Sequence, residues 1–214
     1  MTDISDIEPY SDQDVPQVID RLINDDEFIK AIGQLKFKAW FTPLSFILRP
    51  RIRSFLRSKA QVIQTIQDFQ SAVEPQLAKV LSRTTETFTV SGLDHLNPEQ
   101  SCLFLSNHRD IAMDPAFVNW ALYNGGLHTV RIAIGDNLVK KPFVGDLMRL
   151  NKSFIVKRNV SGPREMLQTY SALSGYIRQS IEDGHSIWIA HREGRAKDGI
   201  DRTDPAILKM IAMA

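Results

Sequence analysis

The chain has 214 residues, of which 43% are hydrophobic and 24% charged, and its formal net charge is +1 at pH 7. This balance is typical of one globular domain, or of a domain with an appendage, and it excludes a wholly disordered, collagenous or coiled-coil chain. The single cysteine excludes an internal disulfide framework, and the small net charge gives no indication of a nucleic-acid partner.

The amino-terminal segment is acidic and polar, whereas a secretory signal needs a basic start and an apolar core. No window of the sequence approaches the roughly 20 apolar residues that a membrane-spanning helix needs. We therefore expect an intracellular protein. Charge is unevenly distributed, because residues 1–30 hold nine acids and two bases, and residues 31–60 hold seven bases and no acid.

The first part of the chain, residues 1–84, is predicted to be a helical region. Apolar side chains recur at helical spacing, with Asp14 as a candidate N-cap for the first helix. Pro43 and Pro50 are expected to break any long helix between the second and third of these segments. The expected helices cover residues 15–23, 28–35 and 52–80.

Within this region, residues 36–57 mix aromatic and aliphatic side chains with Lys and Arg. That mixture suits the boundary between acyl chains and anionic headgroups, and its apolar centre, residues 39–48, is long enough to enter a bilayer but not to cross it. The alternative is an ordinary core segment with a solvated basic rim. The predicted membrane contacts are Phe37, Trp40, Phe41 and Phe46.

From about residue 85 the hydrophobic period changes, and short apolar runs alternate with helical patterns through residue 214. This alternation predicts an α/β domain, with a mixed sheet flanked by helices. The expected strands cover residues 87–92, 102–107, 128–135, 153–156 and 185–190, and the expected helices cover 114–123, 142–150, 162–182 and 204–214.

Candidate chemistry follows three of these strands, at the sheet edge where open α/β domains bind ligands. His108 comes after the second expected strand, with acids at Asp110 and Asp114, and a histidine oriented by a carboxylate can act as a general base. Asp114 before Pro115 also suits a helix N-cap, which leaves a purely structural role open.

Two more clusters follow later strands. Lys157 and Arg158 lie just before a helix start, which suits a phosphate site, although a solvated basic turn is the alternative. Glu193, Gly194 and Arg195 follow the last strand, where Glu can bind a hydroxyl and Arg a phosphate.

In this order, the three clusters resemble the motifs of the glycerolipid acyltransferase family, which includes 1-acylglycerol-3-phosphate and glycerol-3-phosphate acyltransferases. The resemblance covers residues 85–214. It implies that His108 is the general base and Asp114 its orienting partner. It also implies that Asn107, Lys157, Arg158, Glu193, Gly194 and Arg195 bind the acceptor.

The resemblance further implies transfer of an acyl group from acyl-CoA or acyl carrier protein to a glycerol-phosphate-type acceptor, with lysophosphatidate expected. It implies no metal, no bound cofactor and no acyl-enzyme. The expected location is the cytoplasmic side of a membrane, where the protein is peripheral or monotopic and meets anionic phospholipid. The alternatives are a non-catalytic lipid-binding protein with the same fold and a thioester hydrolase.

The sequence departs from the family pattern in three places. The gap between His108 and Asp114 is five residues rather than four, so the loop must bulge, and Asp110 is a rival partner. Arg195 follows Gly194 directly, one residue earlier than in the family. The family's last proline motif is absent, so we expect the α/β domain to be incomplete, completed from elsewhere, or missing part of its acyl-binding wall.

Overall fold

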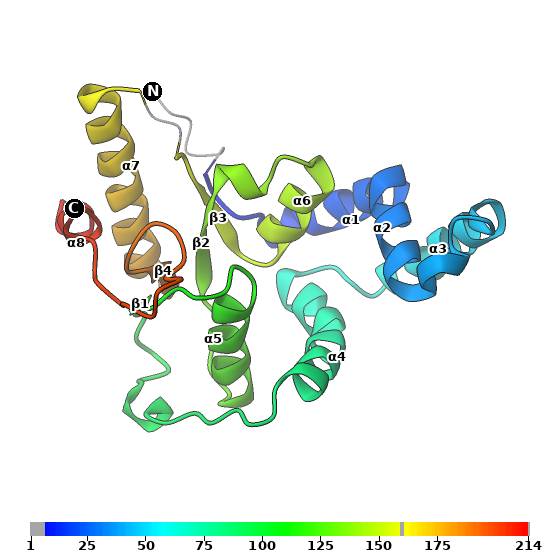
Figure 1. The fold of residues 1–214 in the computed structure, drawn as a ribbon, viewed down its shortest axis with the longest axis horizontal. Helices are drawn as coiled ribbons and strands as arrows, with labels where there is room; N and C mark the ends of the chain where they lie inside the picture. Colours follow the sequence, from blue (N-terminus) through cyan, green and yellow to red (C-terminus); the bar gives the residue numbers. More distant parts are fainter. Residues whose placement is uncertain (1–6, 159–160, 214) are drawn as a thin grey trace. The chain divides into compact units, whose positions relative to one another are not determined.

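The protein is described here by a computed structural model that covers residues 7–158 and 161–213, and its chain divides into two compact units (Figure 1). The sheet unit comprises Met1–Glu8, Thr87–Asn137 and Ser153–Ala214, and the helical unit comprises Pro9–Glu86 and Leu138–Lys152. The predicted boundary after residue 84 lies close to the observed one. The sequence did not predict that residues 138–152 return to the helical unit, where Leu150 is fully buried.

The sheet unit contains four strands in the order β1-β4-β2-β3, and every observed pair is parallel. The α/β prediction is confirmed, but the sheet is parallel rather than mixed over the described residues. Parallel strands bring their carboxyl ends to one edge, which is where the three predicted clusters lie. The strands are β1 (Leu103–Ser106), β2 (Arg131–Gly135), β3 (Ser153–Val156) and β4 (Ile187–Ala190).

The strand expected over residues 87–92 does not form, so that prediction is wrong. Phe88 stacks on Phe117 with ring centroids 5.0 Å apart, but Phe88 and Val90 stay 40% and 44% exposed. An alternating pattern predicts a strand with one buried face, and this segment has no such face.

The helices of the sheet unit are α5 (Met113–Asn124), α7 (Pro163–Glu182) and α8 (Pro205–Ile211). Helices α7 and α8 lie side by side, and both contribute to the main core of this unit (Figure 1). That core buries aliphatic and aromatic side chains from β3, β4, α7 and α8, namely Phe154, Leu173, Tyr176, Ile177, Ile187, Ile189 and Met210.

The helical unit contains five α-helices around its own core. They are α1 (Val15–Asn24), α2 (Asp26–Phe37), α3 (Ser45–Ala60), α4 (Ile66–Thr84) and α6 (Pro142–Leu150). Short 3₁₀ turns, η2 (Asp12–Asp14), η3 (Lys38–Trp40), η4 (Leu93–His95) and η5 (Asp136–Leu138), connect elements of the chain.

The helix expected over residues 52–80 is two helices, α3 and α4. The second begins with a capping box, in which Thr65 accepts a hydrogen bond from the backbone N–H of Asp68 at 3.0 Å and Asp68 accepts from that of Thr65. Pro50 does not break α3, contrary to the prediction, and lies inside it. Because proline has no backbone N–H, one hydrogen bond of the helix, to a carbonyl of its first turn, is missing.

An ion pair joins α1 to α6 inside the helical unit. The guanidinium of Arg21 contacts Asp146 through Nε and Nη2, at 2.8 and 2.7 Å, and the hydroxyl of Tyr10 donates to the same carboxylate at 2.7 Å. Burial alone would raise the pKa of Asp146, but these hydrogen bonds outweigh it and hold the pKa below its usual value.

Among the described residues, no helix is both long enough and apolar enough to cross a membrane.

Candidate functional site

His108 lies in the loop after β1, with its side chain mostly buried. Its Nδ1 is 2.9 Å from Oδ2 of Asp114, which sits in the first turn of α5. The same oxygen accepts hydrogen bonds from the backbone N–H groups of Arg109, at 2.6 Å, and Asp110, at 3.0 Å. Because a carboxylate that receives three donors acts only as an acceptor, this geometry favours a hydrogen on Nδ1 and a free lone pair on Nε2.

These hydrogen bonds explain how a five-residue gap is accommodated. The extra residue is taken up by folding two loop amides onto Asp114, so the structure pairs His108 with Asp114 rather than with Asp110. Asp110 instead accepts the backbone N–H groups of Ala112 at 2.9 Å and Met113 at 2.8 Å. Those two bonds lower the pKa of Asp110, with further contributions from nearby positive charge.

A tryptophan borders the histidine. Trp188 of β4 meets the His108 ring edge-on with centroids 6.0 Å apart, and its indole N–H donates to Ser106 Oγ at 2.9 Å. The imidazole is thus held by a carboxylate on one nitrogen and by an aromatic ring on its side. A group held in this way can remove a proton from a hydroxyl that approaches Nε2.

The loop after β4 folds back onto the histidine loop. The backbone N–H of Ala196 donates to the carbonyl of His108 at 2.8 Å, and that of His191 donates to the carbonyl of Ser106 at 2.9 Å. Gly194 turns this loop with φ +74°, a conformation that residues with a Cβ rarely adopt. The first and third predicted clusters are therefore joined through the backbone.

Asp201 ties the same two loops together through side chains. Its Oδ2 accepts a hydrogen bond from Nδ2 of Asn107 at 2.8 Å and one from Nη2 of Arg109 at 2.5 Å, so it holds the residues on both sides of His108. The pKa of Arg109 is raised by this carboxylate. Sequence reasoning missed Asp201 because its partners lie more than 90 residues away, and no local pattern marks it.

The two bases of the second cluster have different neighbours. Arg158 reaches the site, with Nε 3.9 Å from Oε1 of Glu193. Lys157 lines a small cavity with Thr169 and Leu173 of α7. The acceptor-binding role of Lys157 stays a prediction. Arg195 lies near enough to Asp110 to lower its pKa.

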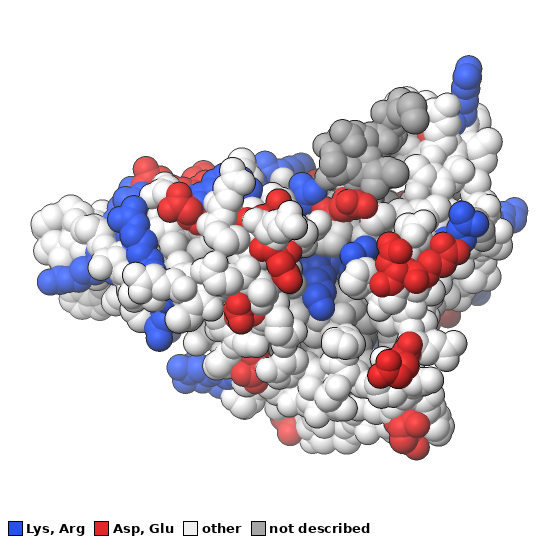
Figure 2. Space-filling view, turned by 180° about the vertical axis from the view of Figure 1, so that it is seen from behind, with Lys and Arg blue, Asp and Glu red and all other residues white. Residues whose placement is uncertain are grey.

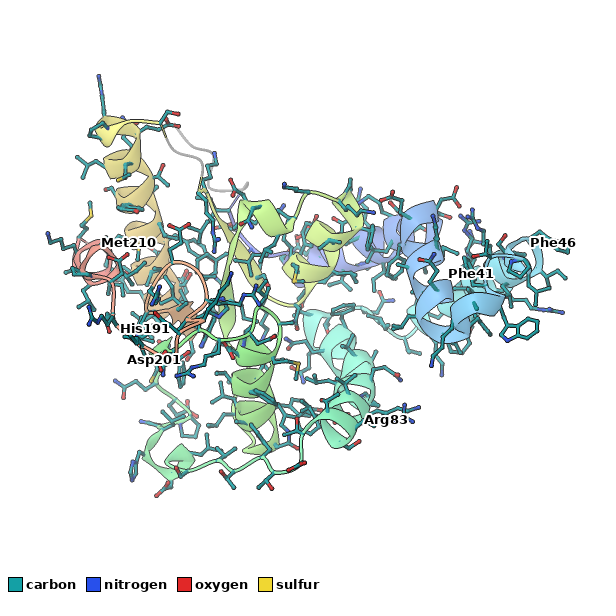
Figure 3. All side chains as sticks on the ribbon, viewed as in Figure 1. Phe41, Phe46, Arg83, His191, Asp201 and Met210 are labelled. Atoms are coloured by element: carbon teal, nitrogen blue, oxygen red, sulfur yellow. The ribbon has the colours of Figure 1, made fainter. Side chains whose placement is uncertain are left out.

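Two of the four predicted membrane contacts are largely exposed. Trp40 and Phe46 are 73% and 74% exposed, and Phe46 points away from the helices in Figure 3. Phe37 is half-buried. Phe41 is only 2% exposed and packs in a core cluster over Gly33, so its assignment as a membrane contact is wrong.

Part of the positive charge in this segment is neutralised within the helical unit. The carboxylate of Asp26 in α2 forms ion pairs with the guanidinium groups of Arg53 at 2.8 Å and Arg49 at 3.4 Å. The acidic and basic stretches of the sequence therefore pair with each other. Lys36 remains on the exposed surface, 5.2 Å from the ring of Phe55. Figure 2 shows Lys and Arg side chains beside an uncharged surface at the end of these helices.

Sequence comparison agrees with the motifs. The acyltransferase family model matches residues 87–203, more than half of the chain. A glycerol-3-phosphate acyltransferase from Xanthomonas axonopodis pv. citri is 32% identical over 127 residues, which are 58% of this chain and 14% of that relative. One from Xylella fastidiosa strain M23 is 28% identical over 110 residues, 51% of this chain and 12% of that relative.

Among solved structures, the 1-acyl-sn-glycerophosphate (LPA) acyltransferase PlsC from Thermotoga maritima aligns with a TM-score of 0.47 and 16% identity. The alignment covers 92% of this chain and 67% of that one. The matched segments are a small part of the curated relatives, about one seventh of their length. The family match covers all three motifs and the strands that precede them, so the chain belongs to the acyltransferase family.

Proposed function

We propose that this chain transfers a fatty acyl group from an acyl thioester to a hydroxyl of a glycerol-phosphate-type acceptor, in phospholipid biosynthesis. The observation that carries the proposal is the pairing of His108 with Asp114 at 2.9 Å beside two arginines, Arg158 and Arg195, at one sheet edge. A general base next to cations suits a substrate that carries both a hydroxyl and a phosphate.

In the proposed reaction, Nε2 of His108 removes the hydroxyl proton as the oxygen attacks the thioester carbonyl. The new C–O ester bond forms, the C–S bond breaks, and the thiolate leaves and takes up a proton. Asp114 stabilises the imidazolium that forms in between. Arg158 and Arg195 hold the acceptor phosphate, and Glu193 accepts a hydrogen bond from an acceptor hydroxyl.

The acceptor is either lysophosphatidate, which the motifs predict, or glycerol 3-phosphate, which the names of the curated relatives suggest. The donor is acyl-CoA or acyl carrier protein. The bilayer surface, on the cytoplasmic side, is the proposed location. Exposed Trp40 and Phe46, with Lys36 and Lys38 nearby in sequence, support interfacial contact.

The test is release of free CoA from palmitoyl-CoA in liposomes with four acceptors: lysophosphatidate, glycerol 3-phosphate, monoacylglycerol and none. The proposal predicts release only with a phosphate-bearing acceptor. Equal release without acceptor identifies a thioester hydrolase. Binding to liposomes without release under any condition identifies the lipid-binding alternative.

A further inference from the structure

The space beside Gly135, at the end of β2, is filled by the side chains of Arg158 and Asn137. Gly135 is the last residue of β2, is buried, and pairs in register with Val156 of β3. A Cβ at this position would lie well under 3.0 Å from Nε of Arg158 and 2.8 Å from its Cζ, distances that real Cβ atoms essentially never show. The φ of Gly135 is not positive, so glycine is needed here for space rather than for backbone conformation.

The guanidinium of Arg158 fills the space that this glycine leaves. It lies against the strand backbone, with about a third of the side chain exposed and Nε 3.9 Å from Glu193. An arginine that follows a strand has many rotamers, and fixing it on binding a ligand costs entropy. A slot that already holds the planar group removes part of that cost, and a planar group fits such a slot better than an ammonium does.

Asn137 lies over the same slot. Its Oδ1 is 2.5 Å from the Cβ position at Gly135, so its carboxamide and the guanidinium of Arg158 share this end of β2. Asn137 is exposed, and its carboxamide also carries N–H donors, which a phosphate could accept. Sequence reasoning assigned no role to Gly135 or Asn137.

We propose that Gly135 is a positioning residue that seats Arg158 for phosphate binding, and that Asn137 is a further acceptor-binding residue beside it. This inference rests on the proposed function. It assigns the specificity for a phosphate-bearing acceptor to the end of β2, in addition to the loop after β4.

The test is a double-mutant cycle of Gly135→Ala and Arg158→Ala, read as KM and kcat for the phosphate-bearing acceptor. Gly135→Ala alone is expected to raise KM about tenfold with kcat little changed, because it displaces the arginine. With Arg158→Ala in place, the same change is expected to raise KM clearly less than it does in the wild-type background, because only the contact with Asn137 is then left to disturb. The remaining contact, with the flexible end of Asn137, is cheap to relieve.

Asn137→Ala is expected to raise the KM for the phosphate-bearing acceptor about threefold to tenfold with kcat little changed. An unchanged KM would overturn the role of Asn137. The control for the glycine is Gly175→Ala in α7, where a Cβ meets nothing within 4 Å, and it is expected to leave KM and kcat unchanged. Equal effects of Gly135→Ala with and without Arg158 would overturn the proposal, because the glycine would then act on the fold alone.

Melting temperatures of the same variants separate this inference from the proposed function. Gly135→Ala is expected to lower the melting temperature in the wild-type background and much less in the Arg158→Ala background. Calorimetry then measures binding of glycerol 3-phosphate. The inference stands and the enzymatic proposal fails under three results together. Gly135→Ala lowers the melting temperature much more when Arg158 is present, it weakens binding of glycerol 3-phosphate, and the wild type transfers no acyl group. Uncoupled melting temperatures would reject the inference whatever the activity.

Discussion

Asp114 pairs with His108 although the loop between them is one residue longer than in the family pattern. The loop folds so that two of its backbone N–H groups donate to the Asp114 carboxylate. One oxygen, Oδ2, contacts His108 Nδ1 at 2.9 Å while accepting two loop amides. The carboxylate is therefore part of the loop's own structure as well as the partner of the histidine. A longer loop does not loosen the pair, because the additional amides are satisfied at the same atom.

Asp114→Asn is expected to lower kcat about a hundredfold or more, since an amide cannot stabilise the imidazolium and can select the wrong tautomer. The measurement is steady-state acyl transfer. The matched control is Asp110→Asn, which keeps an acceptor for the amides of Ala112 and Met113 and is expected to change kcat by less than about threefold. Equal losses in the two variants would show that the structure pairs the wrong aspartate with His108.

Asp201→Asn tests the side-chain link between the two loops. The variant keeps the shape of the side chain but loses the charge that Arg109 contacts at 2.5 Å, so we expect kcat to fall about tenfold while the melting temperature changes little. Asp198→Asn, a change in the same loop at a residue whose carboxylate accepts a hydrogen bond from the backbone N–H of Ile200, is the control. An unchanged kcat in Asp201→Asn would remove Asp201 from the site.

The aromatic segment separates into residues that hold the fold and residues that face outward. Phe41→Ala is expected to lower the free energy of unfolding by about 3 kcal/mol or more, because Phe41 fills a buried cluster. Trp40→Ala and Phe46→Ala are expected to leave unfolding nearly unchanged and to weaken binding to anionic liposomes about tenfold each. Unaltered liposome binding in the double variant of Trp40 and Phe46 would contradict the interfacial proposal.

The ion pair of Arg21 and Asp146 predicts how the stability of the protein depends on pH. The folded pKa of Asp146 lies below the ordinary value of 3.8, so its contribution is fully present above that value and is lost as pH falls through the folded pKa. Asp146→Asn is expected to lower the free energy of unfolding by about 1–2 kcal/mol at pH 7, a modest amount because Arg21 is half-exposed. It is also expected to make that free energy fall less steeply between pH 7 and 3. Urea unfolding over this pH range measures both effects, and a fall as steep as in the wild type would contradict this assignment.

Local patterns predicted the alternation of strands and helices well, and the polar residues after strands marked the site edge. They failed where a partner far along the chain decides the outcome. The segment that begins at Thr87 alternates like a strand, yet Phe88 stacks on Phe117 of α5 and no strand forms there. Phe41 looks like an interfacial residue, yet Gly33 gives its ring a buried place.

The candidate site shows the same division. His108 and Glu193 could be predicted because motif order marks them, and Asp114 because the family pairs it with the histidine. Asp201 could not, since its role depends on contacts with Asn107 and Arg109 across 94 and 92 residues of sequence. Nor could the sequence show that Arg158 lies close to Glu193, because that contact joins two loops of the folded sheet unit.

The most direct test of the central claim is acceptor-dependent release of CoA from palmitoyl-CoA in liposomes, measured side by side for the wild type and His108→Ala. Removing a general base lowers the rate by about 10²- to 10⁴-fold, so we expect the variant to lose nearly all acceptor-dependent release while keeping liposome binding and its melting temperature. Acceptor-dependent release that survives in His108→Ala at more than about a tenth of the wild-type rate would contradict the account, because the proton would then leave by another route.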